Sequence, residues 1–170
     1  MQSTDEQARA LRAAGLRVTA PRLAVLRALL AQPHADTETV IGSARTELGS
    51  VSPQAIYNVL GALVQTGLVR RIEPAGSPAL YELRVGDNHH HAVCRRCGTT
   101  ADIDCAVRRR PCLTPSETHG YLLDEAEVTF WGLCPTCQHT APPPADPATR
   151  SSSRSPLTPT AVTTHHEGAR

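Results

Sequence analysis

The segment Val51-Ser52-Pro53-Gln54-Ala55-Ile56-Tyr57-Asn58-Val59-Leu60 carries the clearest structural pattern in the first half of the chain. Ser52 is a preferred helix N-cap residue, and Pro53 follows at the first helical position, where its missing N–H is harmless. The apolar residues recur with the spacing of one helix face: Ile56, Leu60, Leu63 and Val64. We therefore predict a helix that begins at Pro53 and ends before Gly67, which suits a helix C-terminus.

Three further helices are predicted upstream of this stretch. Residues 3–6 have the spacing of a capping box, and Gly15 is placed to end the helix that follows. Thr19 can cap a second helix, and Asp36 a third that ends at Gly49. The residues expected to face inward are Leu23, Leu26 and Leu30 in the second helix and Val40, Ile41, Ala44 and Leu48 in the third.

Two short strands are predicted downstream, at Leu68–Ile72 and Leu80–Leu83, joined by a turn at residues 76–78. Helices followed by a two-stranded hairpin form a winged helix-turn-helix. We predict an α+β fold in which residues 1–85 form a winged-helix DNA-binding domain.

In a helix-turn-helix the second helix enters the major groove with its N-terminal residues facing the bases. The residues that this geometry places near DNA are Ser52, Gln54, Ala55, Tyr57 and Asn58. Candidates for phosphate or minor-groove contacts are Arg17, Arg22, Arg70 and Arg71. The alternative is that these polar side chains are only solvated. The net charge of +1 does not by itself indicate nucleic-acid binding.

Two Cys-x-x-Cys pairs, Cys94/Cys97 and Cys134/Cys137, are called the cysteine hooks below. Together they can supply four thiolates, the closed tetrahedral set that structural Zn²⁺ prefers. The first residues are polar and acidic, unlike a secretory signal, and no apolar run reaches the about 18 residues of a membrane span. We therefore expect a cytoplasmic protein with reduced thiols and no membrane partner, in which the cysteines bind metal rather than form disulfides.

Residues 86–139 are predicted to form a second, smaller unit stapled by zinc, since they offer few large apolar side chains for a core. Strands are expected at His90–Val93, Thr100–Ile103 and Glu125–Trp131, with a short helix at Leu113–Thr118. Residues 140–170 form a Pro/Ser/Thr-rich tail that we expect to be disordered.

Three consecutive histidines, His89, His90 and His91, precede the first cysteine pair. Imidazoles are borderline ligands that suit Fe²⁺, Mn²⁺ or Zn²⁺ at a second, more open site. Because side chains alternate along a strand, His90 is expected to point away from its two neighbours. Cys105 and Cys112 are either a thiol switch or inert cysteines.

Taken together, these motifs resemble the ferric uptake regulator family. The matching segments are Gly15–Arg22, Val51–Leu60, Gly67–Val69, His89–Gly98 and Gly132–Cys137, in consistent order over about residues 7–137. The resemblance implies a homodimeric transcriptional repressor with an N-terminal winged helix and a C-terminal α/β dimerisation domain.

The resemblance also implies metal ligands. The family's structural zinc maps onto the four hook cysteines, and its interdomain regulatory site maps onto His34, Glu82, His89 and His91. The peroxide-sensing branch adds an Asp five residues after the first hook, which matches Asp102. That branch's other Asp aligns near Leu83, where Glu82 is the nearest acidic substitute. A third site in some members uses a histidine at the position of Ala126, so we expect that site to be absent or rebuilt.

The sequence thus predicts a metal-dependent repressor that binds palindromic double-stranded operators and senses peroxide and/or iron through interdomain Fe²⁺ or Mn²⁺. One alternative is a repressor that responds only to iron, or to zinc or nickel. An alternative of another class is a zinc-stapled protein-interaction module. An enzyme is not expected, because the cysteine hooks close the zinc site and no His-Glu-x-x-His motif occurs.

Overall fold

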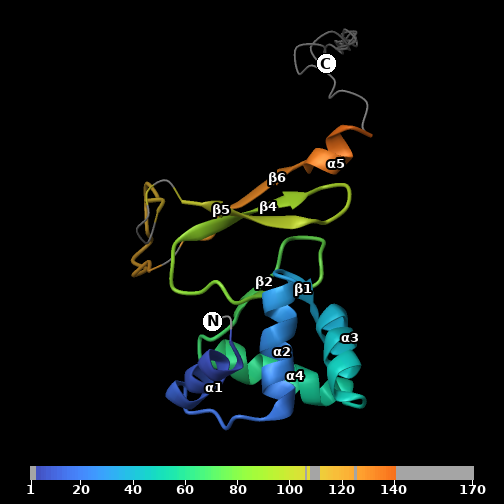
Figure 1. Ribbon diagram of the computed structural model, residues 1–170. Helices are drawn as coiled ribbons and strands as arrows, with labels where there is room; N and C mark the ends of the chain where they lie inside the picture. Colours follow the sequence, from blue (N-terminus) through green and yellow to red (C-terminus); the bar gives the residue numbers. More distant parts are fainter. Residues whose placement is uncertain (1–2, 106, 108–111, 125, 141–170) are drawn as a thin grey trace, which may run out of the picture.

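The computed structural model describes residues 3–105, 107, 112–124 and 126–140 of the 170-residue chain. Apart from Thr140, the tail predicted at residues 140–170 lies outside these ranges. Helices α1 (Thr4–Ala13), α2 (Ala20–Ala31), α3 (Thr37–Leu48) and α4 (Pro53–Gln65) gather at one end of the molecule (Figure 1). A first sheet lies beside them, and a second sheet lies beyond it with the short helix α5 (Pro135–Gln138). None of the helices in the described ranges has the length and apolar character that crossing a bilayer requires.

The predicted helix starts are confirmed, those of α1, α3 and α4 by side-chain capping contacts. Ser3 and Glu6 form the capping box of α1. At the start of α3, the Asp36 side chain accepts a hydrogen bond of 2.8 Å from the backbone N–H of Thr39. The Ser52 hydroxyl accepts one of 3.2 Å from Ala55 at the start of α4. Thr19 occupies the N-cap position of α2 without a side-chain hydrogen bond.

The first sheet is antiparallel and has the strand order β1-β3-β2. Strands β2 (Arg70–Ile72) and β3 (Leu80–Glu82) confirm the predicted hairpin. Strand β1 (Ala35–Asp36) pairs with β3, and sequence analysis missed it because two residues are too few to show a pattern. This strand joins the chain between α2 and α3 to the hairpin, so that residues near position 34 lie beside residues near position 82.

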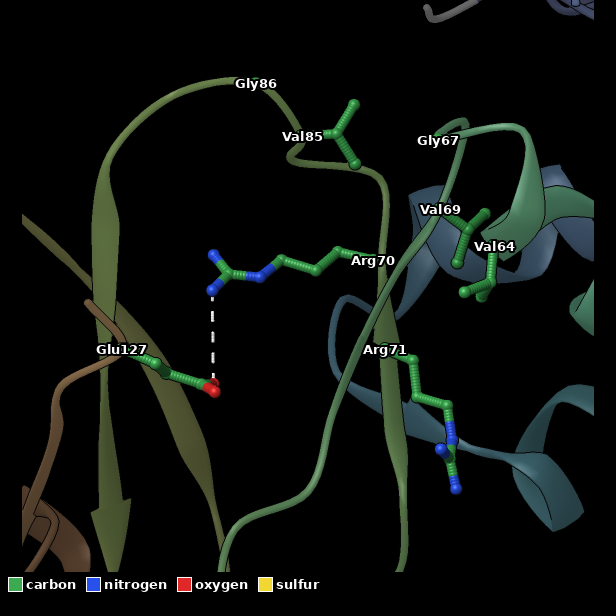
Figure 2. A pocket seen from close by; sticks show the side chains of 8 residues that line it. All are labelled: Val64, Gly67, Val69, Arg70, Arg71, Val85, Gly86 and Glu127. Atoms are coloured by element: carbon green, nitrogen blue, oxygen red, sulfur yellow. Dashed lines mark ion pairs between the residues drawn. The ribbon is translucent and has the colours of Figure 1, made fainter. Parts of the chain in front are cut away.

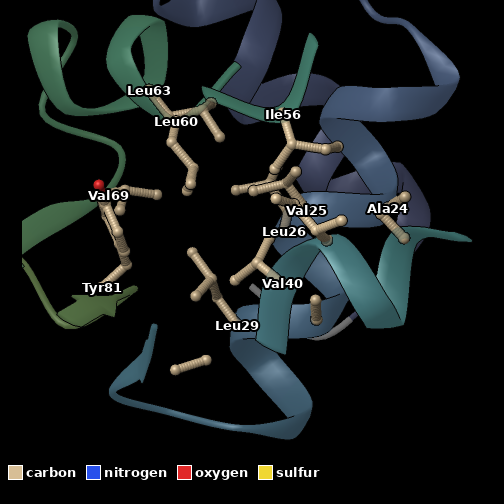
Figure 3. Packing of buried hydrophobic residues seen from close by; sticks show 14 of the residues in the cluster. Ala24, Val25, Leu26, Leu29, Val40, Ile56, Leu60, Leu63, Val69 and Tyr81 are labelled. Carbon is tan, nitrogen blue, oxygen red and sulfur yellow. The ribbon is translucent and has the colours of Figure 1, made fainter. Parts of the chain in front are cut away.

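A single apolar cluster holds the helices and the hairpin together. Figure 3 shows side chains from α2, α3 and α4 meeting Val69 and Tyr81. The prediction that Leu30 faces inward is wrong: Leu30 is 39% exposed, whereas Leu29 is 1% exposed. Because α2 is apolar on almost every side, its sequence does not show which face turns to the core.

The second sheet has the strand order β5-β4-β6. Strand β4 (His89–Cys94) runs antiparallel to β5 (Thr100–Asp104) and parallel to β6 (Thr129–Gly132). The sheet forms near the predicted positions. The third strand begins at Thr129 rather than at residue 125, and residue 125 itself lies outside the described ranges.

The short helix predicted at Leu113–Thr118 does not form, and this segment consists of bends and irregular backbone. Leu113 is 59% exposed, so the segment has no apolar surface to pack against and nothing offsets the cost of nucleating a helix. The predicted boundary between residues 85 and 86 falls in the connection between the two sheets and stays a prediction.

Replacing Leu29 by alanine should cost about 2–5 kcal/mol in the free energy of unfolding, because it leaves a cavity in the core. Leu30→Ala, the same substitution one residue further along α2, should cost about 1 kcal/mol or less, because that side chain already contacts solvent. Denaturant unfolding of both variants measures the two costs. Equal costs would contradict the orientation of α2 described above.

Candidate metal centres

The four hook cysteines come together at the end of the second sheet that carries α5. Cys94 is the last residue of β4, Cys97 follows in the turn towards β5, Cys134 is the N-cap of α5, and Cys137 lies within that helix. Their four sulfur atoms lie within 4.8 Å of one another. All six cysteines of the chain are free thiols, so no disulfide competes for them.

This geometry fits a tetrahedral zinc ion. A Zn–S bond of about 2.3 Å separates neighbouring sulfurs of a tetrahedron by about 3.8 Å, and the sulfurs of Cys97 and Cys134 are 3.7 Å apart. Hydrogen bonds from the backbone of Cys134 and Cys97 lower the pKa of Cys94 to about 6. A thiol that ionises this easily is available as a thiolate ligand at neutral pH.

A second cluster lies between the helical half and the second sheet. His34, Glu82, His91 and Asp102 each direct one ligand atom to a common point, and these atoms lie within 4.8 Å of one another. The Nε2 atom of His34 is 2.8 Å from Oδ1 of Asp102 and 3.0 Å from Oε2 of Glu82. The Nε2 atom of His91 is 3.2 Å from the same Glu82 oxygen. Atoms from four different segments thus surround one position.

The two halves of the molecule contribute to this cluster equally. His34 follows α2 and Glu82 ends β3, whereas His91 lies on β4 and Asp102 on β5. His34 has a φ of +62°, a conformation that is uncommon for a non-glycine residue. Such backbone strain tends to occur at functional sites, where surrounding contacts hold the residue in place.

His89 lies at the edge of this cluster. Its Nε2 atom is 3.1 Å from Oε1 of Glu82 but 3.9 Å from Oδ1 of Asp102. Its other ring nitrogen, Nδ1, is 2.7 Å from Oδ1 of Asp87, and that contact orients the ring. The structure therefore brings all five predicted ligands together, although His89 is not among the four whose ligand atoms all lie within 4.8 Å of one another.

Sequence reasoning missed the residues that support the ligands. Arg84 donates to three carboxylates, those of Asp87, Asp102 and Asp104, with distances of 2.6 Å, 3.3 Å and 2.6 Å. Arg84 thereby fixes the ligand Asp102 and, through Asp87, the ring of His89. Nothing in a linear sequence shows that one arginine contacts acids both in the loop before β4 and on β5.

The cluster keeps its acidic ligand ionised. Burial opposes ionisation of Glu82, but hydrogen bonds from His34 and His91 outweigh burial and lower its pKa to about 2. Burial likewise opposes protonation of His34, yet the hydrogen bond to Glu82 and the charge of Asp102 raise its pKa. The hydrogen bonds from His34 and His91 thus favour the ionised carboxylate of Glu82, which is the form that binds a cation.

This donor set fits a divalent cation of the first transition row. Imidazole nitrogens and carboxylate oxygens are ligands for Fe²⁺, Mn²⁺ and Zn²⁺, and sulfur is absent from the cluster. Glu82 and Asp102 also line a cavity of about 120 Å³ together with Leu29 and Leu30. A small solute can therefore approach the carboxylate side of the cluster.

A separate cleft lies between the two halves on the side of β2. Figure 2 shows Arg70 extending across it towards Glu127, and their charged atoms are 4.0 Å apart. The guanidinium of Arg70 is also 3.9 Å from Glu82. Arg70, which the sequence suggested as a phosphate contact, thus faces acidic partners inside the molecule.

The predicted DNA-contacting residues lie near the start of α4. Ser52, Gln54, Tyr57 and Asn58 are exposed, Ala55 is half-buried, and Ile56 faces the core. The Gln54 amide donates to Asn58 over 3.0 Å. Arg17 is exposed and Arg22 is half-buried, and the Arg22 guanidinium donates to the carbonyl of Arg17 over 2.7 Å. This end of α4 therefore presents hydrogen-bonding side chains to the outside.

Known proteins match the chain closely. The sequence pattern of the ferric uptake regulator family covers residues 13–130. The transcriptional regulator FurA of Mycobacterium tuberculosis is 62% identical over 137 residues, which span 81% of this chain and 93% of the relative. Ferric uptake regulation protein 2 of Mycolicibacterium fortuitum is 54% identical over 140 residues, which span 81% and 96%.

Solved structures share the fold. The Vibrio cholerae ferric uptake regulator has a TM-score of 0.55 at 26% identity and covers 75% of this chain and 98% of its own. The Pseudomonas aeruginosa regulator, solved with manganese, has a TM-score of 0.55 at 27% identity and covers 76% and 98%. A zinc uptake regulator complexed with zinc and DNA has a TM-score of 0.58 at 20% identity, which shows the fold alone, and covers 82% and 97%.

The relatives are transcriptional regulators and not enzymes. The extent of the family match, the high identity to curated members and the shared fold agree with one another. The chain belongs to the ferric uptake regulator family of metal-responsive transcriptional regulators.

Proposed function

We propose that this protein is a cytoplasmic, homodimeric repressor whose affinity for a palindromic DNA operator depends on Fe²⁺ or Mn²⁺ bound between its two halves. One observation carries the proposal: His34 and Glu82 of the winged-helix half meet His91 and Asp102 of the second sheet at a single point. A cation at that point has ligands in both halves, so its binding energy is spent partly on fixing their relative orientation.

The coupling follows from differential affinity. A ligand shifts a conformational equilibrium only by the difference in its affinity for the two states. When the halves separate, two of the four ligands leave, and the remaining pair binds a cation weakly. Occupancy therefore favours the closed arrangement, and by reciprocity an operator that selects the closed arrangement increases the affinity for the metal.

The DNA side of the proposal rests on α4. Its exposed Gln54 and Asn58 have the amide groups that read adenine bidentately, and Tyr57 can contact a phosphate or a thymine methyl. Two such helices in a dimer would lie a fixed distance apart, and half-sites with matching spacing form a palindrome.

The second sheet supports dimer formation. Its buried apolar residues are few, whereas several large side chains around it are exposed, including Tyr121 at 74%, Leu122 at 98% and Phe130 at 48%. A small unit with this much exposed apolar surface gains stability when a second copy covers it. The zinc thiolate cluster gives the same unit a rigid end to which α5 is attached.

The signal that we propose is peroxide, with iron as the resident cation. Fe²⁺ held by imidazoles and carboxylates supplies one-electron chemistry with peroxide that can oxidise a neighbouring side chain. His34 and His91 are the side chains at risk, since their ring centroids are 5.3 Å apart on either side of the proposed site. The cavity beside Glu82 and Asp102 provides access for a molecule of that size.

The same experiments distinguish two alternative functions from this proposal. A repressor that responds reversibly to iron alone would use the same ligands, and zinc or nickel would compete because both bind a bare nitrogen–oxygen site more tightly than iron. A zinc-stapled interaction module of another class would not show metal-dependent operator binding.

Cys137→Ser should remove one zinc ligand, and the variant should lose its bound zinc together with much of the stability of the second sheet, because structural zinc contributes folding free energy directly. Metal analysis and thermal unfolding measure both effects. Thr136→Ala, an exposed position between the two hook cysteines, is the matched control. A folded, zinc-free dimer of the Cys137 variant would contradict the structural role.

His91→Ala should keep the structural zinc and lose metal-activated operator binding. Loss of a supporting residue alone reduces metal affinity by about 10–100-fold, and loss of a ligand should cost at least as much. Fluorescence anisotropy with the DNA of the protein's own promoter region, with and without Mn²⁺, measures the effect. His119→Ala changes an exposed histidine and should behave as wild type. If His91→Ala responds to Mn²⁺ like the wild type, the proposed switch is wrong.

Iron-loaded protein treated with peroxide should gain one oxygen atom on His34 or His91, whereas manganese-loaded protein should stay intact because Mn²⁺ does not support this chemistry. Peptide mass spectrometry locates the added mass. Oxidation in neither sample would leave reversible iron sensing as the better account.

A further inference from the structure

The two faces of β4 carry different chemistry. In an antiparallel pair, residues directly opposite each other project to the same face. His91 lies opposite Asp102 on the face that contributes to the interdomain cluster. His90 lies opposite Ile103 on the other face, and Cys105 follows two residues later on the same side. The prediction that His90 points away from its neighbours is confirmed by its contact with Cys112.

On that second face, His90, Cys105 and Cys112 form a cluster of their own. One nitrogen of His90 and the sulfurs of Cys105 and Cys112 all lie within 4.8 Å of one another. The Nε2 atom of His90 is 3.3 Å from the sulfur of Cys112. His90 and Cys105 are 6% and 5% exposed, and Cys112 is half-buried. Three potential ligands are thus held together in a largely dry environment.

One hydrogen bond prepares this cluster for a cation. Asn88, opposite Cys105 across the two strands, directs its side-chain amide at that sulfur over 3.2 Å. An N–H donor at this distance stabilises the thiolate form, which is the form that binds metal. The Nδ1 atom of His90 is buried and has no hydrogen-bond partner among the described residues. The nitrogen beside the sulfurs is Nε2, so Nε2 is the atom that a cation shared with Cys105 and Cys112 would bind, and Nδ1 would lie outside its coordination shell.

We propose that His90, Cys105 and Cys112 form a third metal site, which takes a thiophilic divalent cation, with Zn²⁺ as the ion of choice. Two thiolates and one imidazole leave a fourth position for water or another ligand, as in open zinc sites. The ligand types of this site also differ from those of the interdomain cluster. That cluster contains only nitrogen and oxygen ligands and suits Fe²⁺ or Mn²⁺.

This donor set differs from the third site that the family resemblance implies. That site requires a histidine where this chain has Ala126, whose side chain has no donor atom. The backbone oxygen of Ala126 instead lies 4.0 Å from the sulfur of Cys112. The cluster in this chain instead offers the sulfurs of Cys105 and Cys112, which favour a thiophilic cation.

The physical consequence concerns the connection between β5 and β6. Residues 112–124 and 126–128 of this connection contain no helix or strand, and residues 113–124 are exposed. Their contact with the sheet includes the approach of Cys112 to His90 and of His90 to Phe130. A cation that binds Cys112 to residues of β4 and the end of β5 would anchor this segment to the sheet and restrict its motion.

The test is an anaerobic titration of the full-length, reduced protein with Co²⁺ while the structural zinc is retained. Thiolate bound to Co²⁺ gives a near-ultraviolet charge-transfer band. The interdomain cluster contains no sulfur and cannot produce that band. We expect the band to reach its maximum when one Co²⁺ ion per chain is bound by the thiolates. Added Zn²⁺ should then displace the Co²⁺ and abolish the band. Absence of the band at saturation would overturn the proposal.

Variants assign the band to this cluster. Cys112→Ser should remove it, and His90→Gln should shift it or weaken the affinity for Co²⁺. His119→Ala, in the same connection but exposed, should leave it unchanged. A band that survives in Cys112→Ser would show that the sulfur comes from elsewhere and would refute the site.

A second measurement needs no variant and therefore does not depend on correct folding of a mutant. At free Zn²⁺ about ten times the dissociation constant, alkylation of Cys105 and Cys112 by iodoacetamide should slow by about tenfold, because only unbound protein reacts. Peptide mass spectrometry follows both residues separately. Equal labelling rates with and without Zn²⁺ would refute the proposal. Neither assay involves the operator, so the outcome is independent of the proposed repressor function.

Discussion

The arrangement of the two halves depends on the buried carboxylate of Glu82. It is 1% exposed, and it contacts His34 from its own half and His89 and His91 from the second sheet. A buried charge is costly unless partners satisfy it, so the halves can meet in this way only because the imidazoles surround it. The short strand β1 makes this possible, since its pairing with β3 places His34 beside the end of the hairpin.

The protein separates metal chemistry by ligand type and by location. Four sulfurs close one site at the end of the second sheet, where exchange of the ion would cost folding free energy. Nitrogen and oxygen ligands form the interdomain cluster, where looser binding suits a signal. The alternation of side chains along β4 keeps His91 and His90 on opposite faces, so that a single strand can serve two clusters without mixing their donors.

Much of the local structure could be predicted because its causes are local. Capping residues such as Ser52 and Asp36 fix helix starts through contacts within three residues. The Cys-x-x-Cys spacing likewise indicates a thiolate site, since each pair forms its own turn. The wrong predictions concern features that depend on packing between segments distant in the sequence. Leu30 and Leu29 are both leucines on an apolar helix, and only the position of α3 and α4 determines which is buried. Segment 113–118 lacks a helix because nothing packs against it.

The sequence was sufficient to predict the helix-turn-helix pattern, the two cysteine hooks and the imidazoles before the first hook. It also indicated His34, Glu82 and Asp102 as ligands of one site, though only through resemblance to a family. The tertiary structure showed the contact itself, in which His34 lies 3.0 Å from Glu82, 48 residues further along the chain. It also decided that Arg84 links three carboxylates and that Cys112 lies against His90. The physical reason is that helix caps and metal hooks are set by neighbours along the chain, whereas a site between two halves depends on strand pairing and packing that bring distant residues together.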